Sequence, residues 1–511
     1  MLAIVKSCGL HGINGYEVQI ETDINAGLPS MEMVGLADTA IKESKERVRS
    51  AIRNSGLMFS PKKITVNLAP ADIKKEGSLY DLPIAVGILA ATCQVDYKCV
   101  GDTVFIGELS LDGKIRGVKG VLPLLIFAKS KGYKKVVIPY DNKKEAEYIK
   151  DIDVYALKDL EEVVKFLSPE CDILPLEKTE IEMGDAPDKY KQDFKYVKGQ
   201  AFAKRAMEIA AAGGHNILLI GPPGGGKTML AKCLPSILPD LTVSEALETT
   251  KIHSVAGLLS YDEGLVRLRP FRTPHHTASR LALTGGGPAS RPGEVSLAHN
   301  GVLYLDELLE YPRSTLEILR QPLEDHNITV ARVAKTVSYP ADFMLVASMN
   351  PCPCGFFGSK TRECTCTPAQ ITKYLSKLSG PLLDRIDLHI EVDSVTYEEL
   401  ADVSAQAESS ADIKKRVNAA RKIQQERYDG KGFLSNASMD SEMIAKYCAL
   451  DKKSELALKM AFERLGLSAR AHSRILKVAR TIADLAGSET IEFAHLSEAI
   501  GYRSLDRSYW K

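Results

Sequence analysis

A glycine-rich segment, residues 221–228, has the residue types and spacing that bind the phosphates of a nucleoside triphosphate. It reads G-x-x-x-x-G-K-T and consists of Gly221, Pro222, Pro223, Gly224, Gly225, Gly226, Lys227 and Thr228. Its glycines let successive backbone N–H groups point at phosphate oxygens, while Lys227 reaches the terminal phosphates and the Thr228 hydroxyl binds Mg²⁺. An apolar strand pattern at 217–220 precedes it and a helical pattern follows. This context favours a true ATP site over a chance glycine-rich turn.

Two acids end a second apolar run, residues 301–307. Asp306 is expected to bind Mg²⁺, generally through water, and Glu307 to polarise the attacking water. A solvated acidic strand end is the alternative, but an intact phosphate loop upstream favours the catalytic interpretation. A third run, residues 343–348, leads to Asn350, whose amide could orient the lytic water or sense the γ-phosphate. Structural asparagines at strand ends are the competing explanation.

Four of the ten cysteines form a compact pattern of C-x-C, nine residues, then C-x-C. The members are Cys352, Cys354, Cys364 and Cys366. Four thiolates close in sequence, with proline and glycine enforcing turns, can form a tetrahedral site suited to zinc. Free surface thiols and an iron–sulfur cluster are the alternatives. The pattern favours zinc.

Length and composition indicate a multidomain chain and exclude few functions. The 511 residues are enough for roughly three domains. Because 66 basic residues balance 66 acidic ones, any binding of nucleic acid must come from local basic loops. No signal-peptide layout and no apolar run of about 18 residues are present, so we expect a cytoplasmic protein without membrane contact.

The order of predicted elements divides the chain into three parts. Residues 1–167 alternate strands and helices and predict an α/β or α+β domain, with strands at 64–68, 103–110 and 135–139 and helices at 81–92 and 121–131. Residues 168–190 are rich in proline and charge and predict a linker, or else an ordered surface loop. The ATPase core is expected at 191–393, with the cysteine insertion at 351–367. Residues 394–511 read as helical throughout.

The N-terminal part resembles a protease domain that has lost its catalytic residues. Residues 105–139 are similar to the proteolytic domain of Lon-type proteases, which implies an S5-like α+β fold. That family uses a serine–lysine dyad. Matching the flanking glycines places Leu79 at the serine position and Leu122 at the lysine position, and neither side chain can do this chemistry. Ser78 is adjacent, but no lysine follows at the required place, so we expect a pseudo-protease.

The core resembles an AAA+ ATPase. FKYVKGQ, residues 194–200, is similar to the segment that closes over the nucleotide base, which implies that Val197, Gly199 and Gln200 contribute to the ATP site. Asn350 then takes the sensor-one position. The helical residues 394–511 would form the lid of such a core.

The same resemblance assigns two arginines. Arg385, in SGPLLDRIDL, is where AAA+ ATPases place a finger directed at a neighbouring subunit's ATP, and its planar guanidinium suits the spread charge of the phosphoryl group. This role implies a ring, whereas an intrachain pair with Asp384 or Asp387 is the alternative. Arg470, in SARA, matches the sensor-two motif and implies a γ-phosphate contact in the same chain, with Arg474 second.

Two insertions resemble those of magnesium-chelatase and MCM-type ATPases. One begins at FRTPHHTAS, residues 271–279, and the other is a predicted β-hairpin at 327–339. In DNA-translocating relatives such hairpins line the pore. The candidate DNA contacts are Arg332, Lys335, Arg272, His275 and His276. Solvated basic residues are the alternative for the hairpin, and packing for the adjacent histidines, which diverge too much to favour a metal.

Taken over nearly the whole chain, these motifs resemble the ComM/YifB family of magnesium-chelatase-like ATPases. The resemblance implies a hexameric DNA helicase that uses ATP and Mg²⁺ for branch migration during natural transformation. Its partners would be single-stranded, forked or branched DNA, with zinc near the DNA channel. Two alternatives remain open, a magnesium chelatase subunit and an ATP-dependent protease or protein remodeller.

Overall fold

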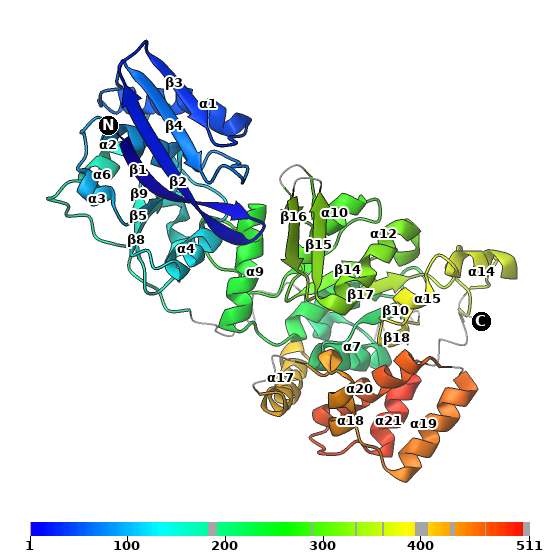
Figure 1. Cartoon of the computed structure of the whole chain (residues 1–511). Helices are drawn as coiled ribbons and strands as arrows, with labels where there is room; N and C mark the ends of the chain where they lie inside the picture. Colours follow the sequence, from blue (N-terminus) through cyan, green and yellow to red (C-terminus); the bar gives the residue numbers. More distant parts are fainter. Residues whose placement is uncertain are drawn as a thin grey trace.

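The computed structural model describes residues 2–181, 192–287, 290–332, 335–359, 362–393, 407–429, 435–465 and 467–503. Nothing is described of the side chains of Arg332, Lys335 and Leu465. Two α/β bodies and a helical C-terminal region follow one another along the chain (Figure 1). The predicted mixed α/β multidomain class is confirmed.

The N-terminal body contains a seven-stranded mixed sheet in the order β3-β4-β2-β1-β5-β8-β9. Its strands are β1 (Leu2–His11), β2 (Asn14–Asn25), β3 (Ser30–Val34), β4 (Lys63–Ala69), β5 (Thr103–Phe105), β8 (Lys135–Pro139) and β9 (Asp153–Leu157). The main helices are α1 (Thr39–Asn54), α2 (Asp81–Ala91), α4 (Val121–Ser130) and α6 (Leu160–Phe166). Every residue of α2 is buried, which makes it the central helix of this core.

The structure corrects the predicted elements of this body in two places. The prediction begins at residue 64 and misses β1–β3, although β2 alternates buried and partly exposed residues from Val18 to Asp23. The single strand expected at 103–110 divides into β5 and β6 (Glu108–Leu109). The division arises because β6 leaves the sheet to pair antiparallel with β7 (Ile115–Arg116).

Part of the predicted linker is attached to the N-terminal body. Leu176 N donates to Val154 O at 2.7 Å, and Thr179 N donates to Glu147 O at 3.0 Å. The ordered-loop alternative therefore holds for residues 171–181, and residues 182–190 lie outside the described part of the chain.

The ATPase core contains a five-stranded parallel sheet in the order β11-β14-β17-β10-β18. These strands are β11 (Phe271–Arg272), β14 (Val302–Leu305), β17 (Met344–Met349), β10 (Ile217–Ile220) and β18 (Leu388–Glu391). The order reverses at β10, which lies between β17 and β18. Ligands bind outside the carboxyl ends of such strands at this reversal, and residues 221–228 begin there.

The helical pattern expected after the phosphate loop is α8 (Lys227–Cys233). The other helices around this sheet include α7 (Ala201–Gly213), α9 (Val243–Ala256), α14 (Pro368–Leu375) and α15 (Gly380–Leu383). The insertions supply α10 (Arg280–Thr284), β12 (Gly285–Gly286), β13 (Arg291–Pro292), α11 (Glu294–Leu297), α12 (Arg313–Glu317) and α13 (Pro322–Asp325). The hairpin consists of β15 (Asn327–Arg332) and β16 (Lys335–Pro340), and the C-terminal helices are α17 (Ser410–Arg427), α18 (Ser441–Tyr447), α19 (Lys452–Leu465), α20 (Ala469–Leu485) and α21 (Phe493–Gly501).

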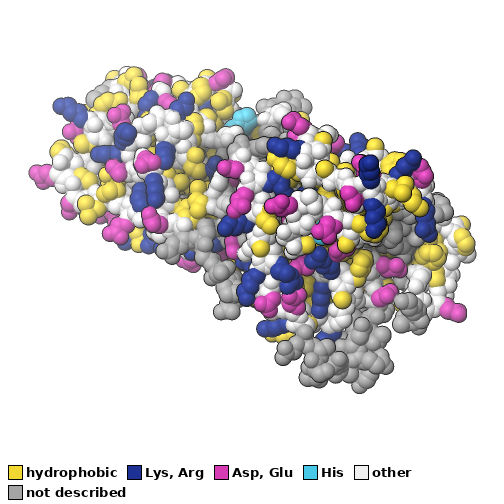
Figure 2. Space-filling view, turned by 90° about the horizontal axis from the view of Figure 1, so that it is seen from below, with side chains coloured by type: hydrophobic (Ala, Val, Ile, Leu, Met, Phe, Trp, Pro, Cys, Tyr) yellow, Lys and Arg dark blue, Asp and Glu magenta, His cyan; other side chains and the backbone are white. Residues whose placement is uncertain are grey.

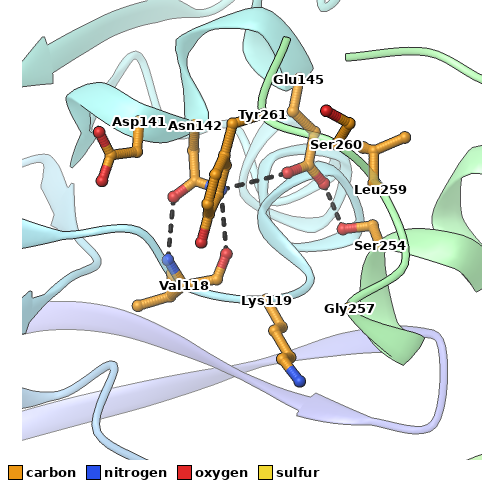
Figure 3. A pocket seen from close by; sticks show the side chains of 10 residues that line it. All are labelled: Val118, Lys119, Asp141, Asn142, Glu145, Ser254, Gly257, Leu259, Ser260 and Tyr261. Carbon is orange, nitrogen blue, oxygen red and sulfur yellow. Dashed lines mark hydrogen bonds between the residues drawn. The ribbon is translucent and has the colours of Figure 1, made fainter. Parts of the chain in front are cut away.

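The N-terminal body packs against the core through α4 and α9. A cavity of about 110 Å³ lies at this contact, where Glu145 points at Ser254 of α9 and Tyr261 extends across the opening (Figure 3). No helix in the described part of the chain is both long and apolar enough to cross a membrane.

Candidate functional site

The phosphate loop has the backbone shape that its glycines predict. Gly224 and Gly226 have φ values of 78° and 83°, which L-residues with side chains rarely adopt. Lys227 Nζ donates to the carbonyl oxygens of Gly221 at 2.7 Å and Pro222 at 2.9 Å. Burial lowers the pKa of Lys227 to about 8, although nearby carboxylates oppose the shift. The loop thus holds a cation beside its glycine-rich backbone.

The two predicted magnesium-binding side chains are in contact. Thr228 Oγ1 donates to Asp306 Oδ2 at 3.0 Å, an arrangement in which both oxygens can face one hydrated Mg²⁺. Burial opposes ionisation of Asp306, but hydrogen bonds from Ser348, Tyr304 and Thr228 bring its pKa below the ordinary value. The carboxylate is therefore charged at neutral pH.

Ser348 and Tyr304 position this carboxylate, and sequence reasoning missed both. Ser348 Oγ donates to Asp306 Oδ1, and Tyr304 OH lies 3.1 Å from Ser348 Oγ and 3.3 Å from Thr228 Oγ1. Each is a polar residue inside an otherwise buried apolar strand. A polar residue within an apolar strand was the sequence signal from which both could have been found.

Glu307 and Asn350 lie at the same edge of the sheet as the loop. Asn350 follows β17 and its Oδ1 accepts from Lys227 Nζ at 3.2 Å, so it lies within reach of a terminal phosphate. Glu307 has a left-handed φ of 50° and its side chain is 55% exposed. Its Oε2 lies 3.4 Å from Nδ1 of His276.

The segment assigned to the nucleotide base is attached to the phosphate loop. Gln200, at a φ of 57°, donates through Nε2 to Asp393 O at 2.6 Å and Gly225 O at 3.3 Å. Val197 O accepts from Lys204 Nζ at 2.5 Å. The expected contribution of Val197, Gly199 and Gln200 fits this position and stays a prediction.

Arg385 forms an ion pair that neither alternative anticipated. Its guanidinium pairs with Glu324 and donates to Pro381 O at 2.7 Å, and its side chain is only 7% exposed. Within the described part of the chain, Arg385 pairs with Glu324 and not with Asp384 or Asp387. The finger role stays a prediction, and it requires the Glu324 pair to open.

Arg470 lies at the opposite edge of the sheet from the phosphate loop. One turn further along α20, Arg474 pairs with Asp387, which is bonded to the backbone just before β10. Arg470 is exposed, and its charge adds to that of Arg385 in lowering the pKa of Glu324. The four residues of β10 separate the two edges by about 13 Å. The same-chain γ-phosphate contact of Arg470 stays a prediction, and it would have to extend across this distance.

The four cysteines converge as predicted. Their sulfur atoms all lie within 4.8 Å of one another, with Sγ–Sγ distances of 3.4, 3.7 and 3.6 Å among Cys352, Cys354 and Cys364. A tetrahedron with zinc–sulfur bonds of about 2.3 Å has edges of about 3.8 Å. None of the ten cysteines is in a disulfide. The donor set fits zinc, and its occupancy stays a prediction.

The candidate DNA contacts differ in their surroundings. Arg332 and Lys335 pair at the hairpin end, but their side chains lie outside the described set. Arg272 donates through Nε and Nη2 to the two carboxylate oxygens of Glu294, at 2.7 and 2.8 Å, so this side chain anchors the insertion. The exposed His275 ring lies 4.1 Å from that of His276. Basic and acidic side chains are interspersed over the face shown in Figure 2.

The predicted protease positions contain no dyad. Leu122 is buried and Leu79 packs against the same apolar cluster. Ser78 Oγ donates to Glu108 instead of a lysine. Leu122 N donates to Glu145 at 2.8 Å, beside the interdomain cavity in Figure 3.

Comparisons with known proteins agree with this architecture. Three magnesium chelatase models match: subunit ChlI at residues 193–400, a second ChlI region at 20–142 and the ChlI C-terminal region at 407–503. The competence protein ComM of Haemophilus influenzae is 45% identical over 511 residues, covering 99% of this chain and 98% of its own. YifB of Escherichia coli is 45% identical over 508 residues with the same coverage, and Lon protease 2 of Bacillus subtilis is 30% identical over 182 residues, 32% of each chain.

The fold and the site thus define an ATPase of the magnesium chelatase type. The chain belongs to the ComM/YifB family of magnesium-chelatase-like proteins. The predicted resemblance is confirmed.

Proposed function

We propose that this protein is an ATP-driven DNA motor that moves branched DNA during recombination of incoming strands. The observation that carries the proposal is the 45% identity, over almost the whole of both chains, to a protein named for competence. The contacts of Lys227 with Asn350 and of Thr228 with Asp306 support it. We propose that the motor acts in the cytoplasm.

Within one chain, each side chain of the site has a separate role in ATP hydrolysis. Lys227 neutralises the terminal phosphates, while Thr228 and Asp306 hold the magnesium ion that accompanies ATP. Glu307 orients and polarises the attacking water, and the side-chain amide of Asn350 contacts the γ-phosphate. Loss of Lys227 would remove nucleotide binding, whereas loss of Glu307 would leave ATP bound but uncleaved.

We place Arg385 and Arg470 on a neighbouring subunit's ATP, in a ring that is expected to be a hexamer. Both lie at the edge of the sheet away from their own phosphate loop, beside Glu324. A cation acting across an interface explains why it is remote from its own nucleotide. The pair with Glu324 would hold Arg385 in a separated subunit and exchange for phosphate on assembly.

Branch migration on forked DNA tests the proposal. The wild-type protein should displace strands with ATP and Mg²⁺, and Glu307→Gln should bind the same DNA without moving it. Arg385→Ala should bind ATP and lose turnover. The motor proposal fails if ATP turnover is insensitive to every DNA tested and no strand moves.

A magnesium chelatase subunit is the second candidate, favoured by the description of the matching family. The four-cysteine cluster and the Lon-like N-terminal body argue against it, since insertion of Mg²⁺ into a tetrapyrrole requires neither. A protease is disfavoured by Leu79 and Leu122. Peptide cleavage that depends on ATP and is abolished by Ser78→Ala would support the protease instead.

A further inference from the structure

Four basic side chains form a stripe along the outward side of α1 in the N-terminal body. They are Lys42, Lys45, Arg49 and Arg53, and all four are exposed. At about 100° per residue they fall within about 80° of the helix circumference, while a separate set of positions on α1 is buried against the body. α1 lies beside β3 and β4, at the end of the body away from α4 and α9 (Figure 1). The stripe thus faces solvent at a distance from the contact with the core.

The four cations of the stripe are not neutralised by the protein. In the described part of the chain, none of them takes part in an ion pair or a side-chain hydrogen bond, whereas Arg47 on the same helix pairs with Asp81 at 2.7 Å. Of the two acids on α1, Glu46 borders the stripe and Glu43 lies toward Arg47. Because the whole chain has no net charge, this row of cations is a local property of α1.

An aromatic ring restrains the two arginines of the stripe. The guanidinium carbons of Arg49 and Arg53 lie 6.0 and 5.9 Å from the centroid of the Phe59 ring. Phe59 packs against the apolar cluster of the body, and the backbone of Met58 exchanges hydrogen bonds of 2.8 Å with the Gln94 side chain. A neutral ring attracts a cation without neutralising its charge. Both guanidinium groups are therefore held in place while their charge stays available to an anion.

The length of the stripe matches a phosphate backbone. From Lys42 to Arg53 the helix rises about 16 Å, and one strand of a duplex carries a phosphate about every 3.4 Å along its axis. Roughly four or five phosphates therefore fall within this length, and guanidinium groups bind phosphate oxygens through two donors at once. A single strand would present bases for stacking, but the Phe59 ring is already in contact with two guanidinium groups. These features favour a duplex.

We propose that the outward side of α1 is a DNA-binding surface that holds the backbone of a duplex arm outside the ATPase core. Its four cations contact phosphates and read no base sequence. The choice of DNA as the polymer rests on the proposed function. The surface adds a contact on the N-terminal body to the candidate contacts of the two insertions, so a body without protease residues takes part in binding the branched substrate.

Fluorescence anisotropy of a labelled duplex, titrated with the full chain at several salt concentrations without nucleotide, tests the proposal. Each phosphate contact contributes about 0.9 to the slope of log affinity against log salt concentration. Arg49→Ala/Arg53→Ala should therefore bind the duplex about tenfold more weakly and reduce the slope by about 1.8, while DNA-free ATP hydrolysis keeps the wild-type rate. Lys42→Ala/Lys45→Ala leaves the Phe59 contacts intact and should reduce the slope by a similar amount.

The matched control removes two cations from another aromatic ring of the same body. Lys143 and Lys158 lie 4.2 and 4.8 Å from the centroid of the Tyr140 ring. Glu147 and Glu162 lie near this group and offset its charge. Lys143→Ala/Lys158→Ala should therefore keep the wild-type affinity for the duplex and the wild-type salt slope.

Several results would overturn the proposal. A wild-type slope in both stripe variants would exclude the α1 contact, while duplex binding by the wild type would leave the motor proposal standing. An equal loss of affinity in the control would show an effect of total charge and not of this surface. Stripe variants that keep duplex binding but no longer bind vesicles of phosphatidylserine and phosphatidylcholine would show a membrane contact instead. A wild-type protein that binds no DNA would contradict this proposal and the proposed function together.

Discussion

Lys227 makes contacts within the phosphate loop that binding of ATP would change. Its ammonium group donates to carbonyl oxygens of the phosphate loop and to Asn350. Triphosphate oxygens are stronger acceptors than these neutral groups. Burial disfavours the charged form of Lys227 when no phosphate oxygens are bound beside it, and the pKa of Lys227 therefore falls to about 8.

This shift predicts how ATP affinity depends on pH. Above about pH 8 the free protein carries a neutral Lys227, so binding must take up a proton and affinity should fall, with a limiting slope of about tenfold per pH unit. Titration with a fluorescent ATP analogue between pH 7 and 9.5 measures it. Lys227→Arg stays charged throughout this range and should show almost no slope. Equal slopes of ATP affinity against pH in wild type and Lys227→Arg would contradict the assignment of this pH dependence to Lys227.

The cysteine loop is a candidate metal site that also lies against the phosphate loop. It leaves β17 directly after Asn350, and Gly355, at a φ of 85°, packs against the Pro223 ring of the phosphate loop. A Cβ at Gly355 would lie 2.6 Å from Pro223 Cδ. The loop therefore forms one wall beside the phosphates.

Gly355→Ala should weaken ATP binding while the four cysteines stay intact. The added methyl group must move the phosphate loop or the cysteine loop, so we expect about a tenfold loss of affinity on top of backbone strain. Equilibrium binding of the fluorescent analogue and metal content by emission spectroscopy are the two measurements. Gly132→Ala is the control, since Gly132 has a φ of 83° and open space around it. Wild-type affinity in Gly355→Ala would show that the wall has no effect.

Two contacts of the N-terminal body reach functional elements of the core. At one, Glu145 accepts from Ser254 at the end of α9, which leads into the first insertion. At the other, the β1–β2 turn meets the second hairpin, where Gly12 leaves no room for a side chain beside Val337. A body without protease residues is thus positioned to hold both insertions.

The Glu145 contact should make the stability of this interface depend on pH. Burial raises the pKa of Glu145 in the folded protein. The stabilisation that Glu145 contributes to the folded protein is therefore fully present below the pKa of this group in the unfolded chain. It is lost as pH rises through the raised pKa of the folded protein. Glu145→Gln mimics the protonated form, so calorimetry from pH 4.5 to 8 should show a thermal stability that exceeds wild type increasingly with pH. Asp141 lies at the exposed rim of the same cavity, so the thermal stability of Asp141→Asn should change with pH in parallel with that of wild type. A Glu145→Gln protein whose thermal stability also ran parallel to wild type would contradict the role of Glu145.

Local features of the chain determined much of the site in advance. The phosphate loop, the acids after β14 and the four cysteines are sets of residues close in sequence, whose spacing alone restricts the backbone they can form. The helices of the C-terminal region were equally predictable, because their apolar period is a property of each segment.

Contacts that depend on how neighbouring strands are aligned were decided only by the tertiary structure. Ser348 reaches Asp306 and His276 reaches Glu307 because parallel strands bring distant residues to one edge, and no spacing along the chain encodes that pairing. The pairing of Arg474 with Asp387 likewise places the start of α20, and with it Arg470, beside the other edge of the sheet. A motif specifies a residue's chemistry, whereas the order and direction of the strands specify which site receives it.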